Sequence, residues 1–169
     1  MNRQPILAGE LVEARPLRAD DFDELYRVAA DPLLWEQHPQ PDRWRREVFR
    51  AYFDDHLASG GALAIVDRAT GALIGATRYD SLDAARSEVE IGWTFLARPY
   101  WGGAYNADLK RVMLEHAFRA VDTVVFLIGE ENLRSRRAVE KLGAVETGRR
   151  RGHVLYELRN RTTERLPGA

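Results

Sequence analysis

Two glycines between a predicted strand and a predicted helix are the first residues whose spacing points to chemistry. Gly102 and Gly103 follow a strand that ends at Leu96 and precede a helix that begins near Ala104. The first amides of a helix have no intrahelical partner, and they point the same way as the positive end of the helix dipole. Because glycine has no Cβ, an anion can approach such a backbone closely. The pattern predicts a diphosphate site, although a tight turn that only needs glycine would look the same.

Two carboxylates on one strand face could act as a base. Glu88 and Glu90 alternate with apolar residues, so both point away from the face that carries Ile91 and Trp93. A carboxylate acting directly or through water could remove a proton from a nucleophile. The pair therefore predicts a general base, and two solvent-facing carboxylates are the alternative.

The remaining polar candidates lie in a loop and in a short helix. His38 belongs to a loop over residues 33–41, where it could position a substrate or have only a structural or surface role. Ser135 starts an apolar helix stripe and could simply be a capping group. No histidine has triad spacing, no cluster of His, Asp and Glu has metal-ligand spacing, and there is no cysteine. We therefore expect no metal, no disulfide and no covalent serine or cysteine mechanism.

Four motifs in order along the chain resemble the GNAT superfamily of N-acetyltransferases, and within it the ribosomal-protein N-acetyltransferase-like branch of the RimJ/RimL type. They are EIGW at 90–93, PYWGGAY at 99–105, GEENLRS at 129–135 and EKLGA at 140–144, and the resemblance covers about residues 9–160. It implies an acyl-CoA-dependent N-acetyltransferase with acetyl-CoA as donor. The acetyl group would pass to a primary amine of a protein N-terminus or small molecule, by direct attack in a ternary complex.

The same resemblance implies roles for individual residues. The pyrophosphate of the donor would lie on the amides of residues 102–106, and its pantetheine arm would run between the strand before the turn and the strand at 124–128. Asn132 matches a pantetheine contact, Ser135 matches a group that can protonate the leaving thiolate, and Glu90 occupies the position of the preferred base. The candidate cofactor-binding residues are Arg98, Trp101, Gly102, Gly103, Ala104, Tyr105, Asn106 and Asn132. The candidate substrate-binding residues are Trp35, His38 and Trp93.

The chain departs from the family pattern at the turn. Pro99 stands where a Gln or Arg is usual, three residues before the first glycine, and Arg98 could replace that side chain only in part. Asp108 would repel a diphosphate if it faced inward, although Lys110 and Arg111 could offset the repulsion. These departures leave open a catalytically inactive acyl-CoA-binding regulatory module, or a nucleotide-binding protein that uses the same turn.

The elements that must position these residues follow from hydrophobic periodicity. We expect helices over 19–30, 42–59, 104–120 and 132–142, and strands over 11–17, 62–66, 72–79, 87–96, 123–128, 145–150 and 153–159. Strict alternation in the strand at 87–96 puts Val89, Ile91, Trp93 and Phe95 on one face. The order β-α-α-β-β-β-α-β-α-β-β predicts an α/β (α+β) fold with a GNAT-like mixed, mainly antiparallel central sheet flanked by helices.

Length and charge limit the other possibilities. The 169 residues fit a single acyltransferase domain over 1–169, with a core at about 9–160 and flexible ends at residues 1–8 and after 160. A net charge of −1 argues against a nucleic-acid partner, whose binding would need a basic surface. No segment is apolar enough for a signal peptide or a membrane span. We expect a cytoplasmic protein with a small-molecule acyl-CoA partner, no membrane contact, and a homodimer as a possible assembly.

Overall fold

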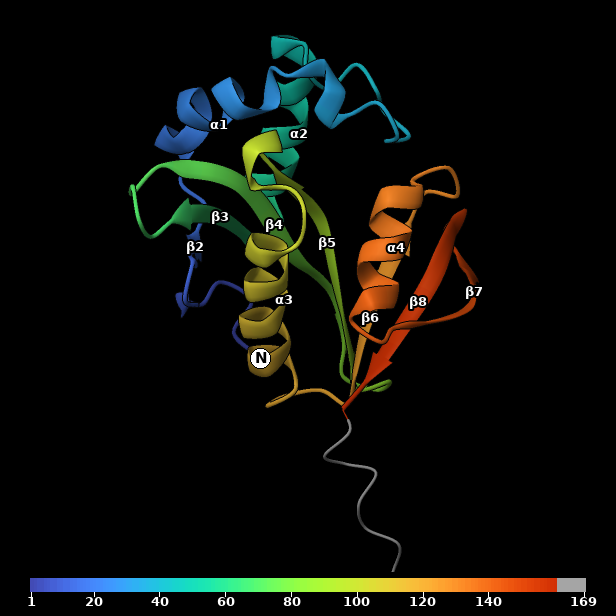
Figure 1. The fold of residues 1–169 in the computed structure, drawn as a ribbon. Coiled ribbons are helices and arrows are strands. Elements are labelled where there is room, and N and C mark those ends of the chain that lie inside the picture. The colour runs from blue at the N-terminus through green and yellow to red at the C-terminus, as the bar shows by residue number, and fades with distance from the viewer. Residues whose placement is uncertain (161–169) are drawn as a thin grey trace, which may run out of the picture.

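The fold is one mixed sheet of eight strands with helices packed on both of its faces (Figure 1). The structure is a computed structural model, and it describes residues 1–160 of the chain. The strands are β1 (Leu7–Ala8), β2 (Val12–Pro16), β3 (Ala62–Asp67), β4 (Leu73–Asp83), β5 (Glu88–Leu96), β6 (Thr123–Ile128), β7 (Val145–Arg150) and β8 (His153–Arg159). The helices are α1 (Phe22–Ala29), α2 (Arg46–Ala58), α3 (Ala104–Ala117) and α4 (Leu133–Lys141), with short 3-10 turns η1 (Ala19–Asp21), η2 (Pro32–Leu34) and η3 (Arg98–Tyr100). The sheet order β1-β2-β3-β4-β5-β6-β8-β7 confirms the predicted fold class.

The two central strands pair only at one end. Every other pair of neighbours is antiparallel, whereas β5 and β6 run parallel and pair residues 88–90 with residues 123–125. Beyond Glu90 the strands diverge, because β5 stays paired with β4 as far as Leu96 and β6 stays paired with β8 as far as Ile128. Figure 1 shows the resulting V, with α3 against one half-sheet and α4 against the other. We call this opening the splay.

A bulge in β5 lies where the strands separate. Trp93 has a φ of 52°, which is rare for a bulky residue, and the register of β4 against β5 shifts opposite it. An extra residue in a strand reverses the faces of all residues that follow. Ile91 therefore packs in the core beside α3, while Phe95 packs among the aromatic side chains of α1 and α2. The predicted strict alternation is wrong beyond Gly92.

Two hydrophobic clusters hold the helices on the sheet. On one face, Leu109 and Met113 of α3 are fully buried against the strands. On the other face, Phe22 of α1 contacts Phe49 and Phe53 of α2, with ring centroids 5.8 and 5.2 Å apart. The half-sheet formed by β1 to β5 thus has a separate core on each face, and the splay opens along its β5 edge.

Some predicted boundaries are corrected by the structure. Residues 1–8 are not a flexible end, since residues 7–8 form β1 and Met1 packs against the core. The second helix begins at Arg46, because residues 42–45 form a turn instead. The third helix ends at Ala117 rather than at residue 120. The predicted flexible tail after residue 160 lies outside the described residues.

Candidate active site

The glycine turn forms the N-terminal end of α3. Gly102 and Gly103 have φ values of 99° and 125°, which side-chain-bearing residues rarely adopt. A Cβ at either position would meet no described atom within 4 Å, so the turn is open on its outer side. The helical ladder starts where Ala107 N donates to Gly103 O (2.8 Å), and Trp101 Nε1 holds the turn by donating to Leu96 O (2.8 Å). This open set of amides at a helix N-terminus fits a diphosphate.

Asp108 does not face the glycine turn. Its carboxylate accepts hydrogen bonds from the backbone amides of Leu11 (2.8 Å) and Val12 (3.1 Å), which lie at the start of β2. Arg111 completes the group with an ion pair of 2.8 Å. The carboxylate therefore anchors α3 to the edge of the sheet, and the repulsion that the sequence raised as a concern does not arise.

Two other side chains at the turn have partners away from the cradle. Arg98 forms an ion pair with Asp31, at the start of η2. The hydroxyl of Tyr105 lies 3.5 Å from Asp67 Oδ1 at the end of β3, so its ring leans away from the splay. Ala104 and Asn106 follow the turn as the first residues of α3. The backbone amides at the start of α3 have the geometry to bind an anion. A contact between the Arg98 side chain and the cofactor stays a prediction.

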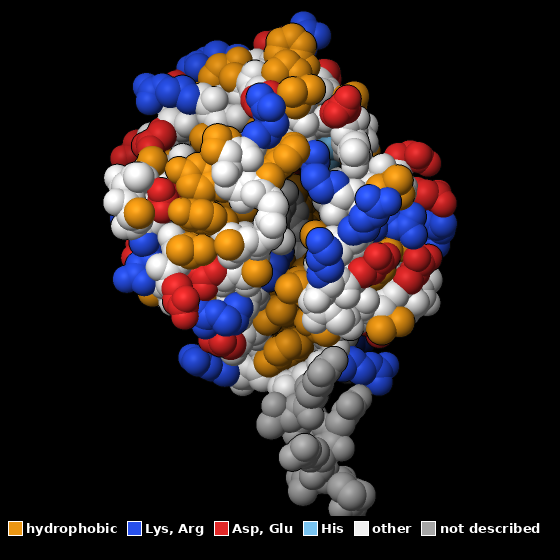
Figure 2. All heavy atoms as spheres, viewed as in Figure 1, with side chains coloured by type: hydrophobic (Ala, Val, Ile, Leu, Met, Phe, Trp, Pro, Cys, Tyr) orange, Lys and Arg blue, Asp and Glu red, His pale blue; other side chains and the backbone are white. Residues whose placement is uncertain are grey.

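The opposite wall of the splay begins at α4. Asn132 caps this helix, because its Oδ1 accepts a hydrogen bond from Ser135 N (3.2 Å). Ser135 is half-buried. The guanidinium of Arg134 lies 3.9 Å from the ring centre of Trp101, so an arginine of α4 contacts the glycine turn across the mouth of the splay. Figure 2 shows the surface hollowed between these halves, with hydrophobic side chains in the hollow and Lys or Arg side chains at its rim.

A buried lysine lies beside the splay on the α3 side. Lys110 is 5 % exposed, and its Nζ donates to Thr94 Oγ1 (2.7 Å), which in turn bonds Thr77 Oγ1 (2.8 Å). Burial lowers the pKa of Lys110 to about 7. Among residues 1–160 the amine forms no ion pair, and its one hydrogen bond goes to Thr94. The sequence contained a signal for this burial, since positions 110, 113 and 117 follow helical spacing.

The two candidate carboxylates differ in their surroundings. Glu88 is paired with Arg150, whose Nη1 lies 2.5 Å from Glu88 Oε1, and the pair lines an open depression at the outer end of β5. Glu90 is 3 % exposed, and its Oε2 lies 3.8 Å from an Arg151 nitrogen. Burial, together with the charge of Asp80 on the neighbouring strand, raises the pKa of Glu90. The structure therefore favours Glu90 as the carboxylate that can accept a proton.

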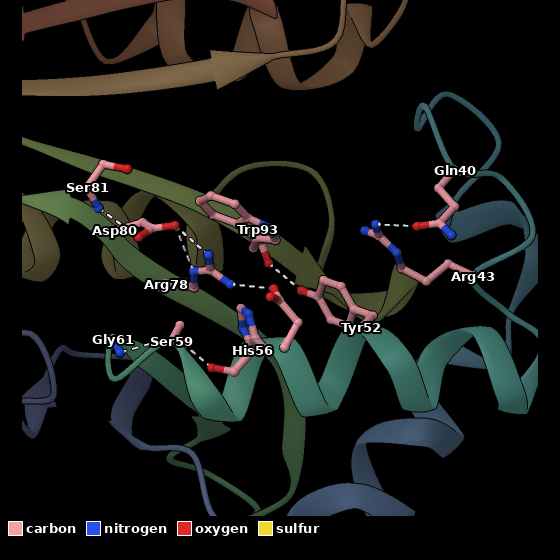
Figure 3. A network of polar contacts seen from close by, with 11 residues as sticks. Gln40, Arg43, Tyr52, His56, Ser59, Gly61, Arg78, Asp80, Ser81 and Trp93 are labelled. Atoms are coloured by element: carbon pink, nitrogen blue, oxygen red, sulfur yellow. Dashed lines mark hydrogen bonds and ion pairs between the residues drawn. The ribbon is translucent and has the colours of Figure 1, made fainter. Parts of the chain in front are cut away.

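A chain of polar contacts surrounds the bulge on the α2 side (Figure 3). Tyr52 donates its hydroxyl to the carbonyl oxygen of Trp93 (2.9 Å), so α2 holds the bulged residue in place. The guanidinium of Arg78 lies 3.8 Å from the Trp93 ring centre and pairs with Asp55 (2.8 Å) and with Asp80. The strained residue is therefore fixed both through its carbonyl and through its ring.

The other two predicted substrate-side residues lie close to Tyr52. Trp35 is buried, donates from Nε1 to Ala29 O (2.8 Å), and has its ring centroid 6.2 Å from that of Tyr52. His38 is half-buried and meets Trp35 edge-on at 5.8 Å. The fold thus brings Trp35 and Trp93 into contact with Tyr52, and His38 into contact with Trp35. Contact of these three residues with a substrate stays a prediction.

Sequence reasoning missed three buried cations at the site, namely Arg43, Arg78 and Lys110. Lys110 was considered only as a counter-charge for Asp108, and Arg43 was not singled out at all. Arg43 is 9 % exposed and lies with its guanidinium carbon 4.3 Å from the Tyr52 ring centre. Its only signal in the sequence was its position within an aromatic stretch before α2.

Metal sites and membrane-spanning helices were considered for the part of the chain that the structure describes. Within it, no three His, Asp or Glu side chains are placed to hold a metal ion. None of its helices is long and apolar enough to cross a membrane.

Comparison with known proteins agrees with this architecture. The family described as "Acetyltransferase (GNAT) domain" matches residues 12–145. A GCN5-related N-acetyltransferase from Brucella melitensis has a similar structure, with a TM-score of 0.77, 20 % identity, and coverage of 92 % of this chain and 79 % of that chain. Mycobacterium smegmatis RimJ, solved in complex with CoA-disulfide, has a TM-score of 0.68 at 20 % identity and coverage of 94 % and 85 %. An acetyltransferase from Agrobacterium tumefaciens str. C58 has a TM-score of 0.69 at 24 % identity and coverage of 92 % and 95 %. No curated protein matches the chain by sequence.

Proposed function

Because the chain belongs to the GNAT family of acetyltransferases, we propose that it transfers the acetyl group of acetyl-CoA directly to a primary amine bound on the α2 side of the splay. The likeness to RimJ supports a place in the RimJ/RimL-type branch. The observation that carries the proposal is the splay itself. It has an open amide cradle at the start of α3 on one face and the buried Glu90 on the other.

The donor side is supported by the free amides and by the diverging strand edges. Residues 102–106 would hold the pyrophosphate, because their amides lie at the positive end of α3. Backbone groups of β5 beyond Glu90 have no partner on β6, so they can bond the amide groups of a pantetheine arm. When bound, acetyl-CoA supplies a thioester that is reactive toward amines.

The acceptor side is supported by the face on which Glu90 lies. Glu90 lies opposite Asp80 of β4 in the register, on the face that carries α2. Its raised pKa makes it a stronger base than an ordinary glutamate, so it can take the proton that an attacking amine must lose. Ser135, half-buried at the start of α4, is the group that we propose to donate a proton to the leaving thiolate.

Initial-rate kinetics with a panel of amines test the proposal. CoA release should require both acetyl-CoA and an amine, and double-reciprocal plots should intersect, as expected for a ternary complex. Glu90→Gln should lower kcat by about 10²-fold or more, whereas Glu88→Gln, which alters the neighbouring carboxylate, should have a much smaller effect. Parallel plots would instead indicate a covalent acetyl-enzyme, and equal losses in both variants would remove Glu90 from its role.

A thermal-shift measurement tests the donor independently of turnover. Acetyl-CoA should raise the unfolding temperature, because a ligand that binds only the folded state stabilises it. Stabilisation without turnover of any amine would favour a binding module, and no stabilisation by any CoA compound would overturn the proposed site.

A further inference from the structure

Arg43 is a buried arginine without a carboxylate partner. Its guanidinium carbon lies 4.3 Å from the ring centre of Tyr52 and 5.2 Å from that of Trp35. Nη2 donates to Gln40 Oε1 (2.9 Å), but Nε has no hydrogen-bond partner among the described residues, and no ion pair with Asp or Glu is formed there. A buried charge of this kind is costly unless an opposite charge reaches it.

Arg78, the other arginine buried on this face, has the carboxylate partners that usually compensate a buried positive charge. It is 7 % exposed and is paired with both Asp55 and Asp80. Arg43 is nearly as buried, yet rings and amides surround it. Figure 3 shows the two arginines on either side of Tyr52, each with its own partners. This difference in carboxylate partners indicates that Arg43 binds an anion from outside the chain.

His38 adds a second donor at the same place. Its Nδ1 accepts a hydrogen bond from the backbone amide of Gln40 (3.0 Å), and burial and the charge of Arg43 lower its pKa to about 4. The neutral ring therefore has its proton on Nε2. Nε2 lies 3.2 Å from Arg43 Nη1, so two N–H donors face each other. An acceptor atom that bridges both would relieve this contact.

These donors lie beside the reaction site. The ring on which Arg43 stacks belongs to Tyr52, whose hydroxyl bonds the Trp93 carbonyl at the bulge (2.9 Å). Arg43 is therefore separated from the splay by one aromatic ring, on the face that carries α2 and not on the face of the glycine turn. An amine placed for attack at the bulge would have its other end near Arg43.

We propose that the acceptor amine carries a carboxylate, which binds the guanidinium of Arg43 and Nε2–H of His38. This inference rests on the proposed function. The planar guanidinium presents parallel donors that match the two oxygens of a carboxylate, and the rings of Trp35 and Tyr52 fix its plane. Asp42 and Asp55 lie near enough to act on Arg43 electrostatically, which favours a singly charged group over a doubly charged phosphate.

Matched acceptor pairs test the proposal. Each amino acid of a panel is compared with its carboxamide, and short peptides with glutamate as the second residue are compared with peptides that have glutamine there. Wild type should prefer the carboxylate member by about tenfold to a hundredfold in kcat/KM, the range expected for a charged hydrogen-bonded contact. Preference in the first set indicates a small amino acid, and preference in the second indicates an acidic peptide.

Variants separate Arg43 from general charge effects. Arg43→Gln should abolish the preference, so that kcat/KM becomes about equal for the two members of each acceptor pair. Arg45→Gln, at an exposed position, is the matched control and should keep the preference. Arg43→Lys keeps the charge without the planar fork, so it should lose most of the preference even if the glutamine variant folds poorly. Equal turnover of both members by wild type, or an unchanged preference in Arg43→Lys, would overturn the inference while leaving the acetyl transfer intact.

A binding measurement distinguishes the two proposals if no amine is turned over. The same carboxylates should protect wild type, but not Arg43→Lys, against thermal unfolding. Protection that is equal in both proteins, or absent in both, would refute the role of Arg43. Absence of turnover alone would count only against the proposed acetyl transfer.

Discussion

Lys110→Met should remove a pH dependence from the stability of this protein. The amine of Lys110 is buried beside β5, and burial lowers its pKa from 10.5 to about 7. Between these two values the unfolded chain binds a proton that the folded chain has released. The free energy of unfolding therefore rises with pH across this interval, by about 1.4 kcal/mol per pH unit. Across the whole interval the effect amounts to about 5 kcal/mol, and below about pH 7 both states are protonated and the slope vanishes.

Methionine is the appropriate replacement because it has a similar length and no charge. Loss of the hydrogen bond to Thr94 should cost about 1 kcal/mol at every pH, so it shifts the stability curve without changing its slope. Urea unfolding from about pH 7 to about pH 9 should therefore show wild type gaining about 2.5 kcal/mol relative to Lys110→Met. Lys141, the other lysine of the chain, is exposed on α4, and Lys141→Met should run parallel to wild type. A constant difference between wild type and Lys110→Met over this range would refute the reasoning.

Three further predictions concern the carboxylate, the turn and the bulge. Burial raises the pKa of Glu90, so kcat/KM should fall as pH is lowered through that raised value, and pH profiles should show Glu90→Gln without this acid limb. Gly103→Ala and Gly71→Ala both place a Cβ at positive φ, 125° and 76°, and each should cost about 1 kcal/mol or more in urea unfolding. Calorimetry should show weaker acetyl-CoA binding only for Gly103→Ala, and equal weakening in both would count against the cradle. Tyr52→Phe leaves the carbonyl of Trp93 without its donor, so the unfolding free energy should fall by about 1–3 kcal/mol, a change that urea titration would detect or exclude.

Lys110 and Arg43 are buried cations that lie beside the splay on opposite faces of the sheet. Lys110 lies on the face of α3, where the donor is proposed to bind, and Arg43 lies on the face of α2, where the acceptor is proposed to bind. Neither has a carboxylate partner among the described residues. Each is therefore a group whose burial becomes less costly when a ligand with suitable acceptors is present.

Local signals in the sequence were sufficient to place several elements. Strands β6, β7 and β8 have the predicted bounds, and α4 begins at Leu133, one residue after the predicted start. The motif at the glycine turn likewise identified a backbone that needs positive φ. The signals that predict these features come from residues close together in sequence, although β6 itself pairs with the distant strands β5 and β8.

Other features depend on packing between distant segments. The bulge at Trp93 cannot be inferred from alternation, because it is held by Tyr52 of α2 and by Arg78 of β4. The short strand β1 exists because β2 offers it an edge. The second helix began later than predicted since residues 42–45 place Arg43 against the aromatic rings instead of continuing the helix.

The sequence by itself determined the fold class, the family and the glycine turn, since periodicity and motif spacing are properties of the linear chain. Both neighbouring glutamates are buried, and only the tertiary structure decided that Glu88 is paired with Arg150 whereas Glu90 lies near the like charge of Asp80. It also decided that Asp108 faces β2 rather than the turn, and that Arg43 and Lys110 are buried without carboxylates. The physical reason is that burial and electrostatic environment come from residues far away in the sequence, and these are what change a common side chain into a reactive one.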